Sequence, residues 1–588
     1  MDAPRTPHGL RALALILPLV AGGGAAALFL QYASAAGLTP WALFCAGLLT
    51  LSTAWLAWGA MLSLIGLLPA TPREVSSAPI RGRTAILMPV CNEDAADTFA
   101  RLAAMIEDLR DAPADIHFAI LSDSSRPEAV AAEAFWFDRL LTETGAEGRL
   151  FYRRRTLNTG RKAGNIADFF RRSGAAYDYA LILDADSLMA GATILEMIRR
   201  IEVEPRIGLL QTLPSVVRAK SVFGRAMQFS ASFYSPVFAR GLARLQGNAG
   251  PFWGHNAIVR TRAWAEACGL PELPGKAPFG GHILSHDIVE AALLARAGWT
   301  VRVDPDLGGS YEEAPENLIE HAKRDRRWCQ GNLQHAKVIR AAGLQGWSRL
   351  SMLLGIVAYV APVFWAGFLI SAVADRATVP PPDYFPDPYQ FFPIFPSDET
   401  AKAIGLFIGI IGLLVMPKLL IVAEAALTGR AAGYGGAARA AVSALADIAL
   451  SSLVAPVMMA FQTRSVVQVL RGADGGWPPN RRGEARLTVA EAFEASHFIV
   501  TLGLAGLFAA WHWGAGLMPW LLPVLVPMIL APVLIALTSR TASGRALFAT
   551  PEETEKPAIL ARHDAILASW TGTSSAEVTA PPLGSVHA

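Results

Sequence analysis

Apolar runs long enough to cross a lipid bilayer occur towards both ends of the chain, and a polar stretch separates them. A helix needs about 20 apolar residues to span the hydrocarbon core. Runs of this kind cover residues 10–30, 41–68, 351–372, 403–426, 495–511 and 518–537. Only 17% of the residues are charged, against about 25% in soluble globular proteins. We therefore expect a multi-span α-helical membrane protein with six firm spans.

The distribution of arginine predicts which ends of the spans face the cytoplasm, because arginine and lysine are enriched on that side. Arginines flank the first two spans at Arg5, Arg11, Arg73, Arg81 and Arg83, whereas the connector 31–40 carries no charge. Arg540 and Arg545 follow the last run. The N-terminus, the polar stretch and the C-terminus are therefore expected in the cytoplasm, and the proline-rich loop 375–402 outside.

Residues 440–469 are apolar as well, but Arg439 precedes them and Arg471 follows them. Positive residues at both ends require an even number of crossings, and Pro456 can break a helix near the middle. A hairpin of two short helices, a re-entrant turn and an interfacial helix all meet this requirement. The total number of spans is therefore six, or up to eight.

The polar stretch 71–348 is long enough for one large soluble domain. Its short β-type runs alternate with helical patterns: strands are expected at 84–89, 117–121, 151–152, 179–183 and 209–212, and helices at 98–109 and 165–172. Such alternation predicts a doubly wound parallel sheet. The chain then divides into a transmembrane hairpin (1–70), this α/β domain, a second membrane region (349–540) and a tail (541–588) that is disordered over 572–588.

Polar residues follow the expected strands, where α/β sheets bind their ligands. Asn92 and Glu93 follow the first strand, Asp123 follows the second, and Asp184 and Asp186 follow the fourth. Two carboxylates one residue apart can share Mg²⁺ with a diphosphate, since Mg²⁺ takes one or two carboxylates plus phosphate oxygens. A capping aspartate is the alternative for this pair, and an ordinary turn residue is the alternative for Asp123.

Two further segments place charged residues at the start of a helix. Lys162, in R-K-A-G-N, can meet phosphate, although a solvated basic turn explains it equally well. Asp287, in S-H-D-I, precedes an apolar helical run. It can act as a general base, or it can simply cap that helix. The neighbouring His286 is interpreted as structural.

The segment R-D-R-R-W lies shortly before the span at 351–372. Arg324 and Arg327 can fork onto phosphate oxygens, and Trp328 offers a flat face to a sugar ring. A basic helix at the membrane interface, with its tryptophan among the headgroups, is the alternative. Trp253 and His255, in W-G-H-N, are further candidates for contact with a sugar.

Together these segments carry a family resemblance over about residues 80–335. MPVCNED, SDSS, GRKAGN, LDADS, SHD and RDRRW occur in the order found in processive family 2 glycosyltransferases, the cellulose-synthase-like membrane enzymes. The longer strings GPFWGHNAIVRTRAW, LPGKAPFGGHILSHDIVEAALLARAGW, DLGGSYEEAPENL and RDRRWCQGNLQH resemble the bacterial glucans biosynthesis glucosyltransferase H family. That family makes the linear, typically β-1,2-linked backbone of osmoregulated periplasmic glucans.

The resemblance implies an inserted cytoplasmic GT-A (Rossmann-like) glycosyltransferase domain, UDP-glucose as donor, and inversion at the anomeric carbon. Asp287 would be the base, and Asp184 and Asp186 would hold Mg²⁺ or Mn²⁺. The donor would be bound by Asn92, Glu93, Asp123, Lys162, Asp184, Arg324 and Arg327, and the growing glucan acceptor by Trp328, Trp253 and His255. The superfamily usually has glutamine where Arg324 stands, so acceptor contacts of cellulose synthase do not transfer directly.

The resemblance also implies a multi-pass protein of the bacterial inner membrane, coupled export of the glucan, and as partners acyl carrier protein and a periplasmic glucan-processing protein. A net charge of +2 argues against nucleic acid as a partner, and four scattered cysteines exclude a disulfide scaffold. Two alternatives stay open. One is a synthase of another β-glycan, such as cellulose; the other is a transporter with a nucleotide-binding domain, in which Glu424 and Asp447 would line a pore.

Overall fold

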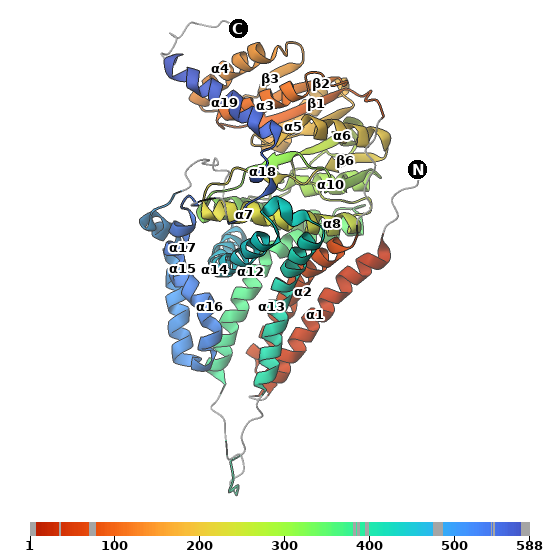
Figure 1. The fold of residues 1–588 in the computed structure, drawn as a ribbon. Helices are drawn as coiled ribbons and strands as arrows, with labels where there is room; N and C mark the ends of the chain where they lie inside the picture. Colours follow the sequence, from red (N-terminus) through yellow and green to blue (C-terminus); the bar gives the residue numbers. More distant parts are fainter. Residues whose placement is uncertain are drawn as a thin grey trace.

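A computed structural model of the chain describes residues 7–34, 37–69, 78–379, 384, 389–393, 399–473, 486–542, 544 and 547–577. Several features interpreted above lie outside the described residues: Arg5, Arg73, Arg545, the prolines at 380–382 and the end of the tail from 578. Long helices form one end of the molecule, and an α/β domain made of residues 78–345 lies above them (Figure 1).

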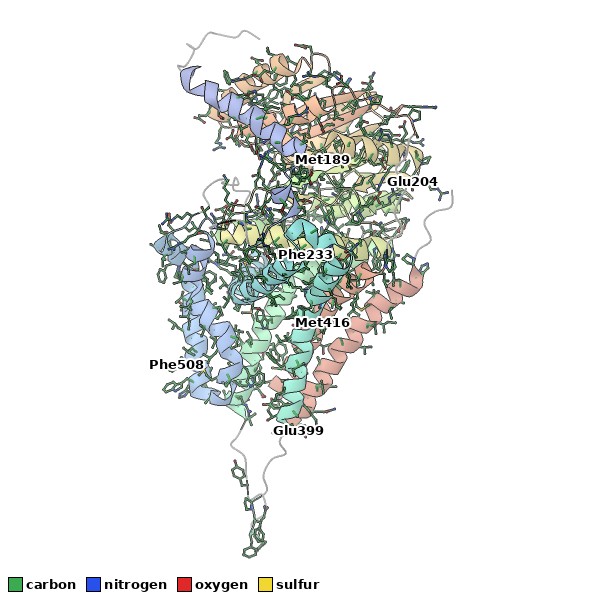
Figure 2. The ribbon with its side chains drawn as sticks, viewed as in Figure 1. Met189, Glu204, Phe233, Glu399, Met416 and Phe508 are labelled. Carbon is green, nitrogen blue, oxygen red and sulfur yellow. The ribbon has the colours of Figure 1, made fainter. Side chains whose placement is uncertain are left out.

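The predicted apolar runs form long helices, which confirms a multi-span membrane protein. They are α1 (His8–Ser34), α2 (Pro40–Leu67), α12 (Gly346–Thr378), α13 (Thr400–Leu427), α15 (Val489–Trp513) and the consecutive pair α16 (Met518–Ile529) and α17 (Ala531–Thr538). The pair bends by 59° at Leu530, after which Ala531 and Pro532 start a new helix. Met416 and Phe508 project outward from α13 and α15 (Figure 2), and both are more than half exposed, as expected for side chains that face lipid.

Residues 440–469 lie within a single helix, α14 (Ala437–Leu470), so the predicted hairpin and re-entrant turn are wrong. Pro456 does not break it. A proline removes one helix hydrogen bond, and here Val454 and Val457 pack in a cluster with Phe223 and Leu318 of the α/β domain, which offsets that loss. In Figure 1 the helix lies close beneath α7 (Val222–Phe233), which it contacts.

Both ends of α14 also reach the α/β domain. Near its end, Arg326 donates to the side chain of Gln468 at 3.0 Å and to the carbonyl of Ala473 at 2.9 Å. Before its start, the hydroxyl of Tyr434 donates to the carbonyl of Ser232 at 2.8 Å. Length and composition allow α14 to count among six candidate spans, or seven with the bent pair, but its contacts fit the third alternative, an interfacial helix.

The main sheet has seven strands in the order β3-β2-β1-β4-β8-β6-β9. They are β1 (Thr84–Val90), β2 (Ile116–Ser122), β3 (Leu150–Arg154), β4 (Tyr179–Ile182), β6 (Ile207–Gln211), β8 (Ala257–Arg260) and β9 (Thr300–Val303). Strand β8 is antiparallel to both of its neighbours, so the sheet is mixed and the prediction of a parallel sheet is corrected at this strand. A second sheet joins β5 (Leu188–Met189), β10 (Ser310–Glu312) and β7 (Ser215–Val216).

Alternate residues of the central strands point to opposite faces of the sheet, as the pleat requires. In β1, Ile86 and Met88 join one core cluster, whereas Ala85 and Leu87 join another. The domain helices that cover these faces or flank the site are α3 (Ala95–Asp108), α4 (Pro127–Thr144), α5 (Arg161–Ser173), α6 (Gly191–Val203), α9 (Thr261–Ala267), α10 (His286–Arg296) and α11 (Leu318–Val338). Both faces are therefore buried, which explains why the strands read as continuous apolar runs.

Two helices without a predicted counterpart, α7 and α8 (Ser235–Leu245), lie between the α/β domain and the long helices (Figure 1). Phe233, labelled in Figure 2, is fully buried at this junction. The two intramembrane acids considered above are ion-paired close by: Glu424 with Arg240 and with Arg430, and Asp447 with Lys418 at 2.7 Å.

The tail forms two helices, α18 (Pro551–Thr554) and α19 (Ala558–Glu577), so residues 572–577 are helical rather than disordered. Helix α19 packs against α3, and Ile559, Leu560 and Trp570 belong to the same core cluster as the sheet. The tail is thus structurally part of the α/β domain. The residues that dock α19, which are Ile559, Leu560, Ile566, Leu567 and Trp570, lie on one face at helical spacing, and the sequence analysis did not pick out this pattern.

Candidate active site

The candidate residues gather where the strands of the main sheet end. Asn92 follows β1, Asp123 follows β2, and Asp184 comes two residues after β4. The ends of β1 and β2 are held together, because the backbone N–H of Asp123 donates to the carbonyl of Val90 at 2.8 Å. The expectation that these polar residues share one edge of the sheet is confirmed.

Asn92 adopts a left-handed backbone conformation, with φ at 62°. Its side-chain oxygen accepts hydrogen bonds from the backbone N–H groups of Ser125 and Arg126, at 3.1 and 3.0 Å. Glu93 accepts a hydrogen bond from the backbone of Cys91. The Asn92 side chain thus ties the loop after β1 to the loop after β2, whereas this Glu93 contact lies within the loop after β1.

Asp123 forms a two-pronged ion pair with Arg155, at 2.7 and 2.8 Å, and its carboxylate is almost wholly buried. The sequence analysis missed Arg155, which follows β3 directly and ends the run Arg153-Arg154-Arg155. Three consecutive arginines give no sign of which one turns inward. The bidentate geometry fixes the orientation of the Asp123 carboxylate at the end of the sheet.

Lys162 connects Asp184-Ala185-Asp186, the aspartate motif, to the segment that contains Trp253 and His255. Its ammonium group is ion-paired with Asp184 and also donates to the carbonyl oxygen of Gly254 at 2.7 Å. Gly254 has a φ of 87°, a conformation that favours glycine. A side chain at Gly254 would touch Asp287, because an added Cβ atom would lie 3.6 Å from the Cβ of that aspartate. Lys162, Asp184 and Asp287 therefore line one small region.

Asp287 lies in the first turn of α10, where the unpaired N–H groups of a helix stabilise a negative charge. The helix start is held from behind, because the carbonyl of Ser285 lies 3.1 Å from the Nε2 atom of the buried His335 of α11. His286 forms an ion pair with Glu290 at 2.8 Å within the same helix. The structural role expected for His286 agrees with this contact.

Glu312, at the end of β10, is an acidic neighbour of the aspartate motif that the sequence analysis did not single out. Burial raises the pKa of its carboxyl; the nearby His255 opposes this, and the charges of Asp186 and Asp184 add to it. Its oxygen lies 3.4 Å from the Nε2 atom of His255. Trp253 is held by its backbone N–H, which donates to Gln211 at 3.0 Å. The string SYEE contains Glu312, but two adjacent glutamates do not indicate which of them faces the site.

Helix α11 supplies the predicted arginines and tryptophan. The guanidinium carbon of Arg324 lies 4.6 Å from the ring centre of Trp328, a cation–π distance. Burial lowers the pKa of Arg324, while the charges of Glu312 and Asp186 act in the opposite direction. Burial and the charge of Arg324 likewise lower the pKa of Arg327. Two desolvated arginines beside the aspartate motif suit a diphosphate.

Trp328 is 44% exposed, so its ring is available to a ligand. The alternative interpretation of this segment, a basic helix at the membrane interface, also has support, because Arg326 faces α14 rather than the site. Neighbouring residues of α11 therefore face two surfaces: Arg324, Arg327 and Trp328 lie at the site, and Arg326 binds the end of α14.

The residues at the aspartate motif fit a divalent cation that arrives with a phosphate ligand. Within the part of the chain that the structure describes, no three His, Cys, Asp or Glu side chains form a ready metal cage. Mg²⁺ bound with a nucleotide needs only one or two carboxylates, since phosphate oxygens and waters complete its shell. Asp184 and Asp186 can supply these, and the Lys162 ammonium now occupies the place beside Asp184 that a cation would share.

Comparison with known proteins identifies the domain. The model described as "Glycosyl transferase family 2" matches residues 85–266, and the model described as "Glycosyl transferase family group 2" matches residues 179–395. The first match covers β1 to β8, with the aspartate motif, and the second covers Asp287 and α11. The domain is thus a family 2 glycosyltransferase domain of the GT-A type, inserted between membrane helices.

Curated relatives extend the similarity over nearly the whole chain. "Glucans biosynthesis glucosyltransferase H" of Cereibacter sphaeroides is 58% identical over 584 residues, which cover 98% of each chain. The protein of the same name from Vibrio cholerae is 40% identical over 539 residues, 89% of this chain and 74% of that one. Among solved structures, a mannosyltransferase from Pyrobaculum calidifontis with GDP-Man and Mn²⁺ is 15% identical, with a TM-score of 0.46; the match covers 73% of this chain and 98% of that one.

Proposed function

Since the chain belongs to the glucans biosynthesis glucosyltransferase H family, we propose that it polymerises glucose from UDP-glucose into a linear β-1,2-linked glucan, with inversion at the anomeric carbon. The observation that carries the proposal is the convergence of Asp184, Lys162 and Asp287 on Gly254. Asp184 and Asp186 would then bind the nucleotide diphosphate. Asp287, on the other side of Gly254, would bind the acceptor hydroxyl.

Donor binding follows from the charges around the aspartate motif. Asp123, fixed by Arg155, accepts hydrogen bonds from the uridine. Arg324 and Arg327 donate to the diphosphate, and Lys162 exchanges its contact with Asp184 for one with phosphate. A divalent cation, Mg²⁺ or Mn²⁺, held by Asp184 and Asp186, would neutralise the charge that develops on the leaving diphosphate. The surrounding side chains need little rearrangement, so they stabilise this charge efficiently.

Asp287 takes the proton from the attacking hydroxyl of the acceptor, and the oxygen of that hydroxyl displaces UDP from the anomeric carbon in one step. Its position in the first turn of α10 places the carboxylate beside the unpaired N–H groups of the helix start. One displacement inverts the configuration, so a single base suffices. Trp328 and Trp253 stack against the acceptor sugars, and His255, whose ring is held by Glu312, lies beside them in the acceptor site.

Glucose is activated on one side of the membrane and the glucan is needed on the other. We place the glycosyltransferase domain, the N-terminus and the C-terminus in the cytoplasm of a bacterial cell, with the chain spanning the inner membrane. Support comes from the arginines around the first two spans and from α11, which leads from the acceptor residues towards α12. Export of the growing glucan is coupled to synthesis, with acyl carrier protein and a periplasmic glucan-processing protein as partners.

The test is incorporation of labelled glucose from UDP-glucose by inside-out membrane vesicles, with and without Mg²⁺, followed by linkage analysis. A metal-dependent β-1,2-linked product inside the vesicles supports donor, linkage and export together. A β-1,4-linked product would support the proposed mechanism but show that the polymer is a different glucan. Product that stays wholly outside, with the donor, would overturn coupled export. Failure of the folded protein to bind UDP would overturn the proposed reaction itself.

A further inference from the structure

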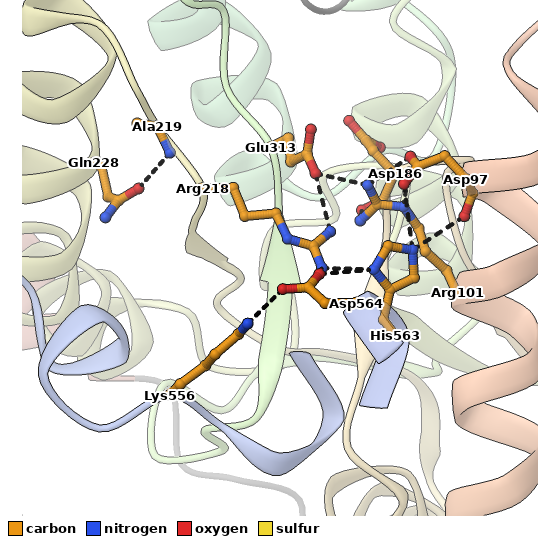
Figure 3. A network of polar contacts seen from close by, with 10 residues as sticks. All are labelled: Asp97, Arg101, Asp186, Arg218, Ala219, Gln228, Glu313, Lys556, His563 and Asp564. Carbon is orange, nitrogen blue, oxygen red and sulfur yellow. Dashed lines mark hydrogen bonds and ion pairs between the residues drawn. The ribbon is translucent and has the colours of Figure 1, made fainter. Parts of the chain in front are cut away.

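The tail helix α19 lies against the α/β domain behind the loop that carries the aspartate motif, and nothing in the reaction described above uses it. Its far end is firmly anchored. The fully buried Trp570 stacks on Trp136 of α4, with ring centres 5.2 Å apart, and its indole N–H donates to Glu143 at 2.6 Å. The near end of α19 instead enters the network of polar contacts shown in Figure 3.

His563 is the residue of α19 that enters this network, and its side chain is only 1% exposed. Its Nδ1 atom lies 2.6 Å from Nη2 of Arg218 and 3.3 Å from Oδ1 of Asp564. Arginine can only donate, so in the shorter contact Nδ1 is the acceptor and the ring N–H is on Nε2. That Nε2 atom lies 3.2 Å from the backbone carbonyl of Asp97 and 3.3 Å from its carboxylate. His563 therefore joins Arg218 to Asp97 in one defined orientation.

Asp97 in turn holds Arg101, one turn further along α3, at 2.8 Å. Arg101 is 1% exposed and donates to two further groups: the carboxylate of Glu313 at 2.6 Å and the backbone carbonyl of Asp186 at 3.1 Å. Burial opposes its charge, but the carboxylates of Glu313 and Asp97 outweigh burial and raise the pKa of Arg101. A permanently charged donor thus fixes the main chain of the second aspartate of the motif.

We propose that His563 is a positioning residue: through Asp97 and Arg101, the tail helix holds the Asp186 carbonyl and Glu313, and thereby sets the affinity of the aspartate motif for nucleotide and divalent cation. Glu313 follows Glu312, the acid beside Asp186. Arg101 therefore holds both segments at the site: the loop with Asp186 and the end of β10 with Glu312. Groups behind a metal ligand orient that ligand, and their loss typically costs about 10- to 100-fold in metal affinity. The inference rests on the proposed function, because it assumes that Asp186 binds the cation.

The experiment measures binding of UDP to the full-length protein in detergent, by calorimetry, as Mn²⁺ is titrated. His563→Leu removes both hydrogen bonds of the ring and leaves an apolar side chain of similar size. Trp570→Phe is the matched control on the same helix, since it loses the bond to Glu143 but touches no member of the Figure 3 network. His563→Gln retains one donor and one acceptor, and is the rescue variant.

We expect His563→Leu to weaken Mn²⁺-dependent UDP binding about 10-fold, with Trp570→Phe within about twofold of the unaltered protein and His563→Gln in between. Equal losses in His563→Leu and Trp570→Phe would overturn the proposal, because looser docking of α19 would then explain both. Unchanged binding in His563→Leu would overturn it as well. If His563→Leu does not fold, Asp97→Asn is judged by the same thresholds.

The unaltered protein separates this inference from the proposed function. If it binds UDP with Mn²⁺, and His563→Leu and Trp570→Phe bind UDP equally well, the proposed donor site is supported and the positioning role of His563 is wrong. If it does not bind UDP with Mn²⁺ at all, the proposed donor site falls, and the role of His563 falls with it.

Discussion

Asp287 and Asp186 lie in the same site but take different parts in the reaction. Asp287 touches the Gly254 segment and starts a helix, whereas Asp186 is fixed through its main chain by Arg101. We therefore expect Asp287→Asn to lower the turnover of UDP-glucose by about 100-fold or more, the range lost with a general base, while the dissociation constant for UDP stays within about threefold. Steady-state kinetics and calorimetry on the same preparation check both values.

Asp186→Ala is the contrasting variant, and it should weaken UDP binding when Mg²⁺ is present but hardly when it is absent. Near-normal turnover by Asp287→Asn would show that another group accepts the proton. In that case Glu312 is the next residue to test, because it is the other acid between the aspartate motif and His255.

Asp325 lies among the arginines of α11, and its burial makes the stability of the protein depend on pH. Burial raises the pKa of its carboxyl to about 6, although Gln462 and Arg324 act against this; the unfolded value is about 4. The folded protein therefore holds a proton that the unfolded chain releases between these values, so stability falls as the pH rises through this window. Above pH 6 the folded state carries the full cost of a buried charge.

Asp325→Asn should therefore match the unaltered protein at about pH 3, where the carboxyl is protonated in both states, and exceed it at about pH 8, by an amount on the order of 2–3 kcal/mol for a pKa raised from about 4 to about 6. Unfolding temperatures in detergent at both pH values measure the difference. Asp111→Asn, at an exposed position, is the control and should show no such pH-dependent gain. A loss of stability at both pH values would mean that the carboxylate is itself a structural partner.

At the scale of elements, the join between membrane and domain depends on two glycines. Helices α2 and α8 approach so closely at Gly66 and Gly241 that an added Cβ at Gly66 would lie 1.9 Å from the carbonyl oxygen of Val237. Gly66→Ala should lower stability by about 1–3 kcal/mol, the usual cost of overpacking. Gly59→Ala, in the same helix with no atom within 4 Å of the added carbon, is the control. Equal unfolding temperatures for the two variants would contradict this close contact.

Sequence reasoning recovered the elements whose signal lies within one segment. The spans are long apolar runs, and β1, β2 and β4 are buried on both faces, so each reads as a short apolar stretch. No strand was predicted at β8, and its antiparallel direction, which makes the sheet mixed, is decided by its partners β4 and β6. Helix α14 was misread because Pro456 was weighed as a local break, whereas packing against α7 and α11 decides its continuity.

The same limit applied to the site. Asp184 and Lys162 stand in recognisable strings and do meet, but Arg155, Glu312 and His563 reach the site or its support from segments whose local sequence is unremarkable. The link between His563 and Asp97 joins residues 466 positions apart. No periodicity or motif within either segment predicts such a contact; only the assembled fold brings the two segments together.

Considered as a whole, the molecule joins its α/β domain to its long helices through several separate contacts. Helix α8 rests on α2, α14 contacts α7 and α11, and the tail returns from α17 to cover α3. Arg225 of α7 pairs with Glu553 of α18 on the way. The domain is therefore held at several separate points, so that a rigid arrangement of active site and membrane helices is expected.

The path of α14 decides how the chain crosses the membrane, and it can be tested without reference to activity. Both ends of this helix contact the α/β domain, so Ala438→Cys and Ala473→Cys, at exposed positions just inside and just beyond the helix, should be labelled by an impermeant maleimide from the same side. Ala515→Cys, in the connector between α15 and α16, should be labelled from the opposite side. The native cysteines interfere little, because Cys45, Cys268 and Cys329 are buried and Cys91 can be replaced. Labelling of positions 438 and 473 from opposite sides would mean that α14 crosses the bilayer, and the tail would then lie across the membrane from the domain that α19 is seen to cover.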